Sequence, residues 1–141
     1  ELAERFAACL RQAARCRESF RASAERMRTE LIKAVSTIPA THVNEGREQA
    51  PHILNLSLIG RDTDYLVALL DEAGFAVSTR SACETDSEEG SRAVLALTGD
   101  HERARATLRV SWGPAISARE LTNFAQALIR AVAFIDSNAQ R

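Results

Sequence analysis

Two residues of the sequence have a type and a setting that point to chemistry, and the first is Cys83. It lies in a polar stretch between a short apolar segment and a predicted helix. A structural cysteine usually lies in an apolar run, because the thiol behaves as a small hydrophobic group. A helix N-terminus and Arg80 would favour the thiolate, whereas the acidic residues Glu84, Asp86 and Glu89 would oppose it. Residue types alone therefore leave two readings, a reactive thiol and an inert surface thiol.

Arg109 is the second candidate, in the middle of a predicted strand. Leu108, Val110 and Trp112 share one face of this strand and Arg109 shares the other with Ser111, because side chains alternate along a strand. An arginine fork at such a position can bind a carboxylate through two parallel hydrogen bonds. The alternative is an arginine on the solvated face of a sheet, and the strand pattern alone favours that alternative.

The other nucleophilic and metal-binding residue types form no recognisable site. Cys9 and Cys16 are seven residues apart on one predicted helix, which is about 10 Å along its axis and too far for a disulfide. Lys33 is the only lysine, against 17 arginines, so chemistry that needs a lysine must use Lys33 or a lysine outside this sequence. The three histidines lie in or beside loops, with no metal or triad spacing: His42, His52 and His101.

Length and composition describe one globular domain, or one domain with a long appendage. The 141 residues are 45% hydrophobic and 26% charged, with a net charge of -1, which excludes collagen-like and disordered chains. This charge balance argues against a dedicated nucleic-acid or membrane-surface binder, and no apolar run is long enough for a transmembrane helix. Three cysteines form no disulfide framework and favour a reducing, intracellular compartment.

The elements that must position Cys83 and Arg109 follow from hydrophobic periodicity and capping signals. Apolar residues at three- and four-residue steps predict an amphipathic helix over residues 2–38, roughly 55 Å long, followed by a polar loop over 39–51. Strands are expected at 52–59, 75–79 and 107–112. Helices are expected from a cap at Asp62, from a capping box at 86–89 to residue 98, and from a capping box at 117–120. The fold class is therefore α/β (α+β), with a small mixed sheet of about three strands packed by helices.

Three passages of the sequence, in the right order, resemble the C-terminal small domain of the cysteine desulfurases. These are pyridoxal-phosphate-dependent enzymes of fold type I, in the class V aminotransferase group. Residues 51–57 resemble the family's Pro-x-Ile-Leu-Asn-x-Ser strand, and residues 78–83 resemble its Ser-Ser-Gly-Ser-Ala-Cys loop. Residues 108–113 resemble its Ile-Arg-x-Ser-x-Gly strand. The spacing of 26 residues between Cys83 and Arg109 is similar to that of the longer-loop branch, which serves general iron–sulfur cluster assembly.

The resemblance implies a role for each candidate residue. Cys83 is expected to take sulfur from L-cysteine as a persulfide and release alanine, and Arg109 to bind the α-carboxylate of the substrate. The implied cofactor is pyridoxal 5'-phosphate, held by a lysine in a large domain that this sequence lacks. The implied partners are a sulfur-acceptor or iron–sulfur scaffold protein and a second copy in a cytoplasmic homodimer, with no nucleic acid and no membrane.

The resemblance also divides the chain. Residues 1–38 are expected to be a linking helix, truncated at its start because no capping residue precedes Leu2, and residues 39–141 the small domain. We expect a C-terminal fragment that is inactive and binds no pyridoxal phosphate on its own. Two departures bear on loop stiffness and on the choice of acceptor: Arg80 stands where the family usually has glycine, and Glu84 where a small hydroxyl residue is common.

Three other interpretations of the sequence remain open. A related class V enzyme, such as a selenocysteine lyase or an aminotransferase, shares the architecture, although an aminotransferase needs no cysteine at position 83. A stand-alone binding module could have kept the fold and lost the cofactor domain. An interaction domain with an incidental thiol is the third.

Overall fold

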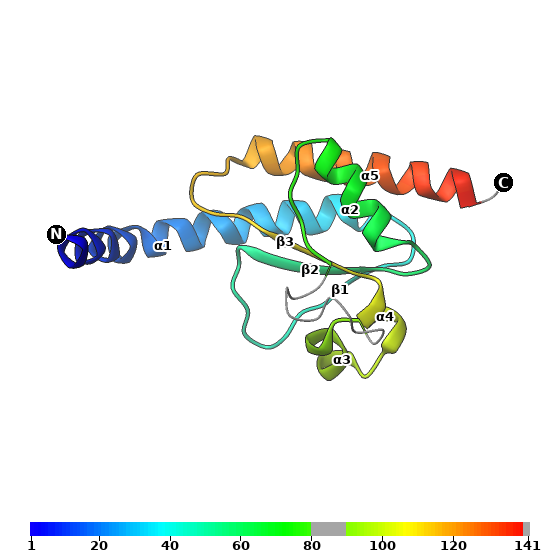
Figure 1. Ribbon diagram of the computed structural model, residues 1–141, viewed down its shortest axis with the longest axis horizontal. Coiled ribbons are helices and arrows are strands. Elements are labelled where there is room, and N and C mark those ends of the chain that lie inside the picture. Colours follow the sequence, from blue (N-terminus) through cyan, green and yellow to red (C-terminus); the bar gives the residue numbers. More distant parts are fainter. Residues whose placement is uncertain (80–89, 140–141) are drawn as a thin grey trace.

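A computed structural model describes residues 1–79 and 90–139 of the chain (Figure 1). In this part the chain forms five helices and three strands. The helices are α1 (Leu2–Val35), α2 (Thr63–Glu72), α3 (Arg92–Thr98), α4 (His101–Arg105) and α5 (Ala118–Ala139). The strands are β1 (Thr41–Val43), β2 (Ile53–Leu58) and β3 (Thr107–Ser111).

The strands form one sheet in the order β1-β2-β3, which confirms the predicted fold class of a small three-stranded sheet packed by helices. Both pairings between the described strands are antiparallel, where the sequence predicted a mixed sheet. The strands that make up the sheet also differ from those predicted. The segment predicted as a strand at 75–79 contributes only a bridge between Ser78 and Arg109, and β1 joins from the predicted loop instead. Three residues are too short a run to show the alternation by which strands are detected.

The two faces of the sheet pack against different helices. Leu54, Leu56 and Leu58 of β2 are fully buried in the apolar core, which lies on the side of α1, α2 and α5 (Figure 1). The opposite face carries Asn55 and Ser57, and α4 packs against that side of β2. Alternation along β2 therefore separates an apolar face from a polar one.

The helix ends were predicted with mixed success. Asp62 caps α2 by accepting hydrogen bonds from two backbone N–H groups, and the capping box at 117–120 is present at the start of α5. The capping box predicted at 86–89 lies outside the described residues. The helix predicted from there to residue 98 begins only at Arg92, with Ser91 as its cap, and the short helix α4, capped by Asp100, was not predicted.

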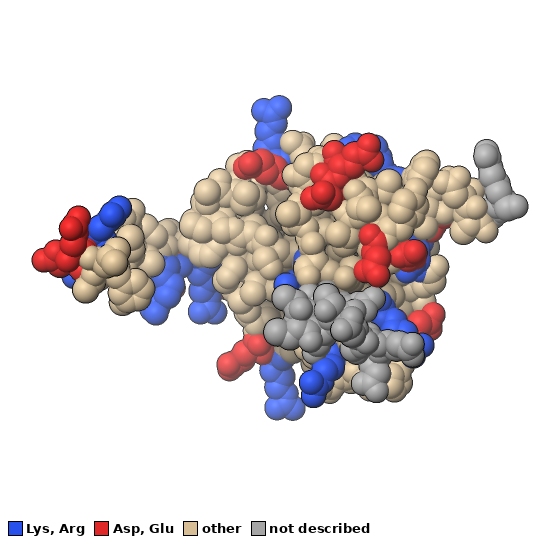
Figure 2. Space-filling model, in the orientation of Figure 1, with Lys and Arg blue, Asp and Glu red and all other residues tan. Residues whose placement is uncertain are grey.

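Helix α1 has two halves with different surroundings. From Ala24 to Val35 its apolar stripe is buried in the core, although the helix ends at Val35 and not at the predicted residue 38. Its N-terminal half projects from the body, and Leu2, Phe6 and Leu10 are 59–83% exposed (Figures 1 and 2). On the face drawn in Figure 2, acidic and basic side chains are interspersed. No helix among the described residues is long and apolar enough to cross a membrane.

Candidate functional site

Arg109 lies on the open face of β3, as the strand pattern predicts. Leu108, Val110 and Trp112 are buried, whereas Arg109 and Ser111 are exposed. Within the described part of the chain, the Arg109 guanidinium makes no hydrogen bond or ion pair. Arg28 and Arg61, in contrast, are buried and paired with carboxylates. Arg109 therefore presents a full set of N–H donors to an incoming anion.

The backbone of Arg109 is tied to the segment that leads toward Cys83. The Arg109 N–H donates to the Ser78 carbonyl at 2.6 Å, and the Ser78 N–H donates back at 3.3 Å. One residue further on, the Thr107 hydroxyl donates to the Thr79 carbonyl at 2.7 Å. The chain entering the 80–89 segment is thus fixed beside the strand that carries Arg109.

The chain leaving that segment is fixed close by. The Ser91 N–H donates to the Ala104 carbonyl at 2.8 Å. Gly90 has a φ of +78° and lies so close to the Ala104 backbone that a Cβ would collide with it. Glycine is needed here both for its backbone conformation and for the close approach. Both flanks of residues 80–89 are therefore held by residues 104–109, while Cys83 and Arg80 lie outside the described residues.

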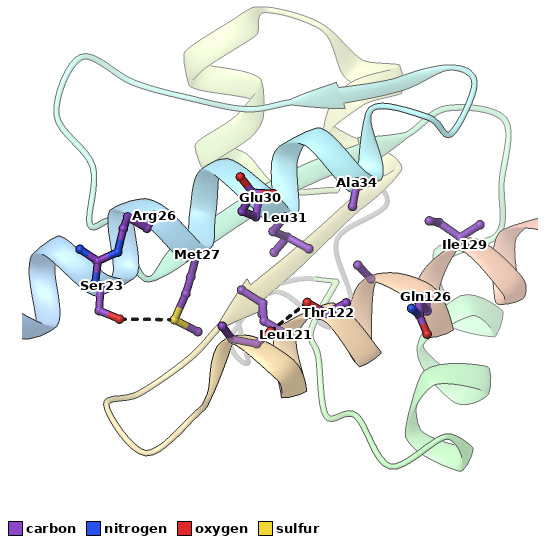
Figure 3. Close-up of a pocket in the computed structure, with 12 residues that line it drawn as sticks. Ser23, Arg26, Met27, Glu30, Leu31, Ala34, Leu121, Thr122, Gln126 and Ile129 are labelled. Carbon is purple, nitrogen blue, oxygen red and sulfur yellow. Dashed lines mark hydrogen bonds between the residues drawn. The ribbon is translucent and has the colours of Figure 1, made fainter.

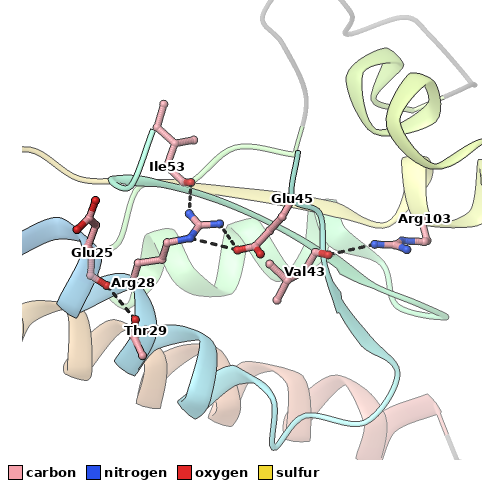
Figure 4. A network of polar contacts seen from close by, with 7 residues as sticks. All are labelled: Glu25, Arg28, Thr29, Val43, Glu45, Ile53 and Arg103. Atoms are coloured by element: carbon pink, nitrogen blue, oxygen red, sulfur yellow. Dashed lines mark hydrogen bonds and ion pairs between the residues drawn. The ribbon is translucent and has the colours of Figure 1, made fainter. Parts of the chain in front are cut away.

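A polar network adjoins Arg109 on the same face of the sheet. The Asn44 amide donates through Nδ2 to Asn55 Oδ1 and to Ser57 Oγ, each at 2.7 Å. Arg103 of α4 donates to Asn44 Oδ1 at 2.5 and 3.1 Å and to the Val43 carbonyl at 3.2 Å (Figure 4). Asn55 and Ser57 lie together on the polar face of β2, because side chains alternate along a strand. Asn44 and Arg103 were missed, because no local pattern pairs residues that are 59 positions apart.

Two buried arginines outside this site have structural roles. Arg28 of α1 donates to Glu45 and, at 2.5 Å, to the Ile53 carbonyl, and so fastens the start of β2 to the helix (Figure 4). Arg61 forms a two-point pair with Asp136 of α5, each bond 2.8 Å long. The hydrogen bond from Arg61 holds the pKa of Asp136 below its ordinary value. Both pairs link sequence-distant elements of the core.

The remaining candidates stay separate in the structure. Cys9 and Cys16 are both exposed on α1. His42 lies on β1 and His101 begins α4, and His52 packs its ring against Phe20 at 5.3 Å. The described residues contain no group of three or more metal-binding side chains.

The described residues also do not fit a pyridoxal phosphate site. Lys33, the only lysine, is exposed in the last turn of α1. A lysine can be made nucleophilic by a desolvating pocket. Lys33 is exposed and lacks such a pocket.

A groove lies between α1 and α5 (Figure 3), and Arg109 is not among the residues that line it. It has a volume of about 480 Å³, and Met27, Leu31, Leu121 and Ile129 are among its apolar lining residues. Arg26 and Glu30 add charge to its lining. The lining contains no cysteine or histidine, so the groove offers apolar contact and not the chemistry expected at Cys83 and Arg109.

Comparison with known proteins identifies relatives, although no family model matches the chain. The cysteine desulfurase IscS of Vibrio campbellii is 36% identical over 88 residues, which are 62% of this chain and 21% of the relative. The cysteine desulfurase IscS of Vibrio atlanticus is 34% identical over 105 residues, 74% of this chain and 25% of the relative. The chain therefore spans about a quarter of the length of these curated relatives.

Solved structures share the fold. A NifS-like protein superimposes with a TM-score of 0.70 at 21% identity, over 86% of this chain and 30% of its own. The aminotransferase TlmJ of Streptoalloteichus hindustanus superimposes with a TM-score of 0.63 at 16% identity, over 86% of this chain and 34% of its own. At these identities the likeness concerns the fold, which desulfurases and aminotransferases have in common. Together with the sequence relatives, it confirms the resemblance that the three motifs indicated: the chain is similar to one part of the cysteine desulfurases.

Proposed function

We propose that this chain is the C-terminal small domain of a pyridoxal-phosphate-dependent cysteine desulfurase. In that protein, residues 1–38 link to a larger domain and residues 39–141 carry the nucleophile and the carboxylate-binding arginine. The observation that carries the proposal is the setting of Arg109. Its guanidinium is exposed and unpaired among the described residues, on the strand to which Ser78 and Thr79 fix the start of the Cys83 segment. The end of that segment is fixed to Ala104 of α4, shortly before the same strand.

In this proposal Arg109 binds the α-carboxylate of L-cysteine through its two-pronged donor geometry. The thiolate of Cys83 attacks the substrate sulfur, so that a sulfur–sulfur bond forms and the substrate carbon–sulfur bond breaks. The electron pair stays with the substrate β-carbon, which takes a proton, and the organic product leaves as alanine. Cys83 then carries the transferred sulfur as a persulfide.

When bound, pyridoxal phosphate supplies the electron sink for this chemistry. We place its lysine in a part of the protein outside this sequence, since Lys33 is exposed on α1. The residues described here supply substrate orientation and not the cofactor site. The isolated chain is accordingly proposed to be inactive.

The persulfide must be passed on. We propose that the acceptor is a sulfur-acceptor or iron–sulfur scaffold protein, that the whole enzyme is a homodimer, and that it acts in the cytoplasm. These statements rest on the resemblance to the desulfurases.

The test is product analysis with the full-length protein that carries this chain. Supplied with L-cysteine and pyridoxal phosphate, it should release alanine and deliver sulfide in the presence of a thiol reductant. An aminotransferase is the second candidate, because TlmJ shares the fold. That activity would yield a keto acid and no persulfide, so the products distinguish the two candidates.

A further inference from the structure

Asn55 lies directly opposite Arg109 in the sheet. Arg109 gives its N–H to Ser78 and not to β2, so Asn55 and Arg109 form a non-hydrogen-bonded pair of the antiparallel ladder. In such a pair the Cα atoms are about 4.5 Å apart and the two side chains rise from the same face. Asn55 is therefore the residue of β2 best placed to share a ligand with Arg109.

The orientation of the Asn55 amide follows from a chain of hydrogen bonds that begins at Arg103. Arginine can only donate, so the Asn44 atom that it contacts at 2.5 Å is the carbonyl oxygen. Asn44 must then offer its NH2 group to Asn55 and to Ser57. The Asn55 atom at 2.7 Å from that group is consequently its oxygen, which leaves the Asn55 NH2 group turned away from Asn44.

The hydrogen bonds around Asn44 and Ser57 hold the side chains that determine the orientation of the Asn55 amide. Asn44 is 8% exposed and Ser57 is fully buried, and the Ser57 hydroxyl donates to the Arg103 carbonyl at 2.8 Å. The backbone N–H of Asn44 also donates to the Asn55 carbonyl at 2.9 Å. These bonds hold the buried side chains of Asn44 and Ser57 in one arrangement, and Asn44 in turn fixes the amide oxygen of Asn55.

We propose that Asn55 is a second carboxylate-binding residue, whose NH2 group donates to the same substrate carboxylate as Arg109, and that Asn44 and Arg103 are its positioning residues. Among the described residues, the Asn55 NH2 group has no hydrogen-bond acceptor, and Asn55 is half-buried on the central strand of the sheet. A carboxylate has two oxygens and about four acceptor positions, so it can take both arginine bonds and one from an amide. This inference rests on the proposed function for the identity of the substrate.

The test uses the cofactor-loaded, full-length protein with Asn55→Asp. This change keeps the oxygen that accepts from Asn44, removes the two donors and places a negative charge beside Arg109. We expect kcat/KM for L-cysteine to fall about tenfold to a hundredfold. The discriminating readout is the ratio of kcat/KM for L-cysteine to that for cysteamine, which lacks the carboxylate. That ratio should fall by the same factor, whereas damage to the fold would lower both values alike.

Two further variants complete the test. Asn55→Ala removes the donors without adding a charge, and should lower the same ratio. Asn123→Asp, at an exposed position of α5, makes the same chemical change away from the sheet and should leave the ratio unchanged. An unchanged ratio in both Asn55 variants overturns the inference, including the case in which both substrates lose turnover equally.

Binding of L-alanine, measured by calorimetry with the same proteins, separates this inference from the proposed function. Absence of alanine release from L-cysteine by the wild-type protein refutes the desulfurase activity. The carboxylate site then still requires that Asn55→Asp weaken L-alanine binding by a factor of ten or more. Equal affinities of wild type and variant refute the site, whatever the activity.

Discussion

Replacing Arg109 tests whether an exposed, unpaired guanidinium on a sheet face is there to bind substrate. The side chain makes no hydrogen bond or ion pair among the described residues. Its strand neighbours Leu108 and Val110, and not Arg109 itself, are buried in the core. Substitutions at such surface positions usually change stability by less than about 0.5 kcal/mol. Arg109→Ala and Arg109→Lys should therefore leave the melting temperature of the protein nearly unchanged.

The expected effect on catalysis is large by comparison. A hydrogen bond to a charged group contributes about 1.5–3 kcal/mol, and each 1.4 kcal/mol is a factor of ten. Arg109→Lys keeps the positive charge and loses the fork, so kcat/KM for L-cysteine should fall about tenfold. Arg109→Ala loses both bonds, and kcat/KM should fall about a hundredfold or more.

The assay is steady-state alanine release by the cofactor-loaded, full-length protein, with thermal unfolding of each variant recorded alongside. Arg119, an exposed arginine in the first turn of α5, provides the matched control, and Arg119→Ala should retain wild-type kinetics. The reasoning fails if Arg109→Ala keeps wild-type kcat/KM. It fails equally if activity is lost only in proportion to a lowered melting temperature.

Two further predictions concern contacts that stabilise the fold. Asp136→Asn should destabilise the protein by about 1 kcal/mol at pH 7, because the two-point pair with the buried Arg61 is lost and Asp136 is itself partly exposed. The folded-state pKa of Asp136 is lowered, so its contribution is present above the unfolded pKa of about 3.9 and disappears as the pH falls through the lower folded value. Denaturant unfolding at several pH values should show the difference between wild type and variant vanishing in acid, and a difference that persists there contradicts this account. Gly90→Ala should lower stability by about 2 kcal/mol or more, since a Cβ meets the backbone at the end of α4, and an unchanged melting temperature would contradict that close approach.

The sequence predicted much of the fold from particular residues. The cap at Asp62 and the capping box at 117–120 are present because each depends on side chains within a few positions of the backbone groups they bind. The alternation in β3 correctly assigned Leu108 to the buried face and Arg109 to the open face. Capping signals and the alternation of apolar residues depend on neighbouring positions, and they were sufficient to predict these elements.

What the sequence did not predict depends on contacts between distant residues. Strand β1 exists because His42 and its neighbours pair with β2, not because Thr-His-Val has a strand pattern. The expected strand at 75–79 is not formed among the described residues, where this segment contributes an isolated bridge between Ser78 and Arg109. The network from Arg103 of α4 through Asn44, the residue after β1, to Asn55 of β2 leaves no local trace in the sequence.

The candidate site was predicted in part, and by two kinds of evidence. The exposed position of Arg109 followed from the strand pattern and is confirmed. Its role and that of Cys83 came from the resemblance to the desulfurases, and both stay predictions. Asn55 emerged only when the register set it opposite Arg109.

Mass spectrometry of the full-length, cofactor-loaded protein after one exposure to L-cysteine shows whether Cys83 receives the substrate sulfur. We expect one added sulfur atom on the peptide that contains Cys83, and its loss after treatment with a thiol reductant. Cys83→Ser should bind the cofactor but gain no sulfur, while Cys9→Ser and Cys16→Ser, at exposed thiols of α1, should gain it as the wild type does. Sulfur added to Cys9 or Cys16 in place of Cys83, or undiminished alanine release by Cys83→Ser, would show that Cys83 is not the nucleophile.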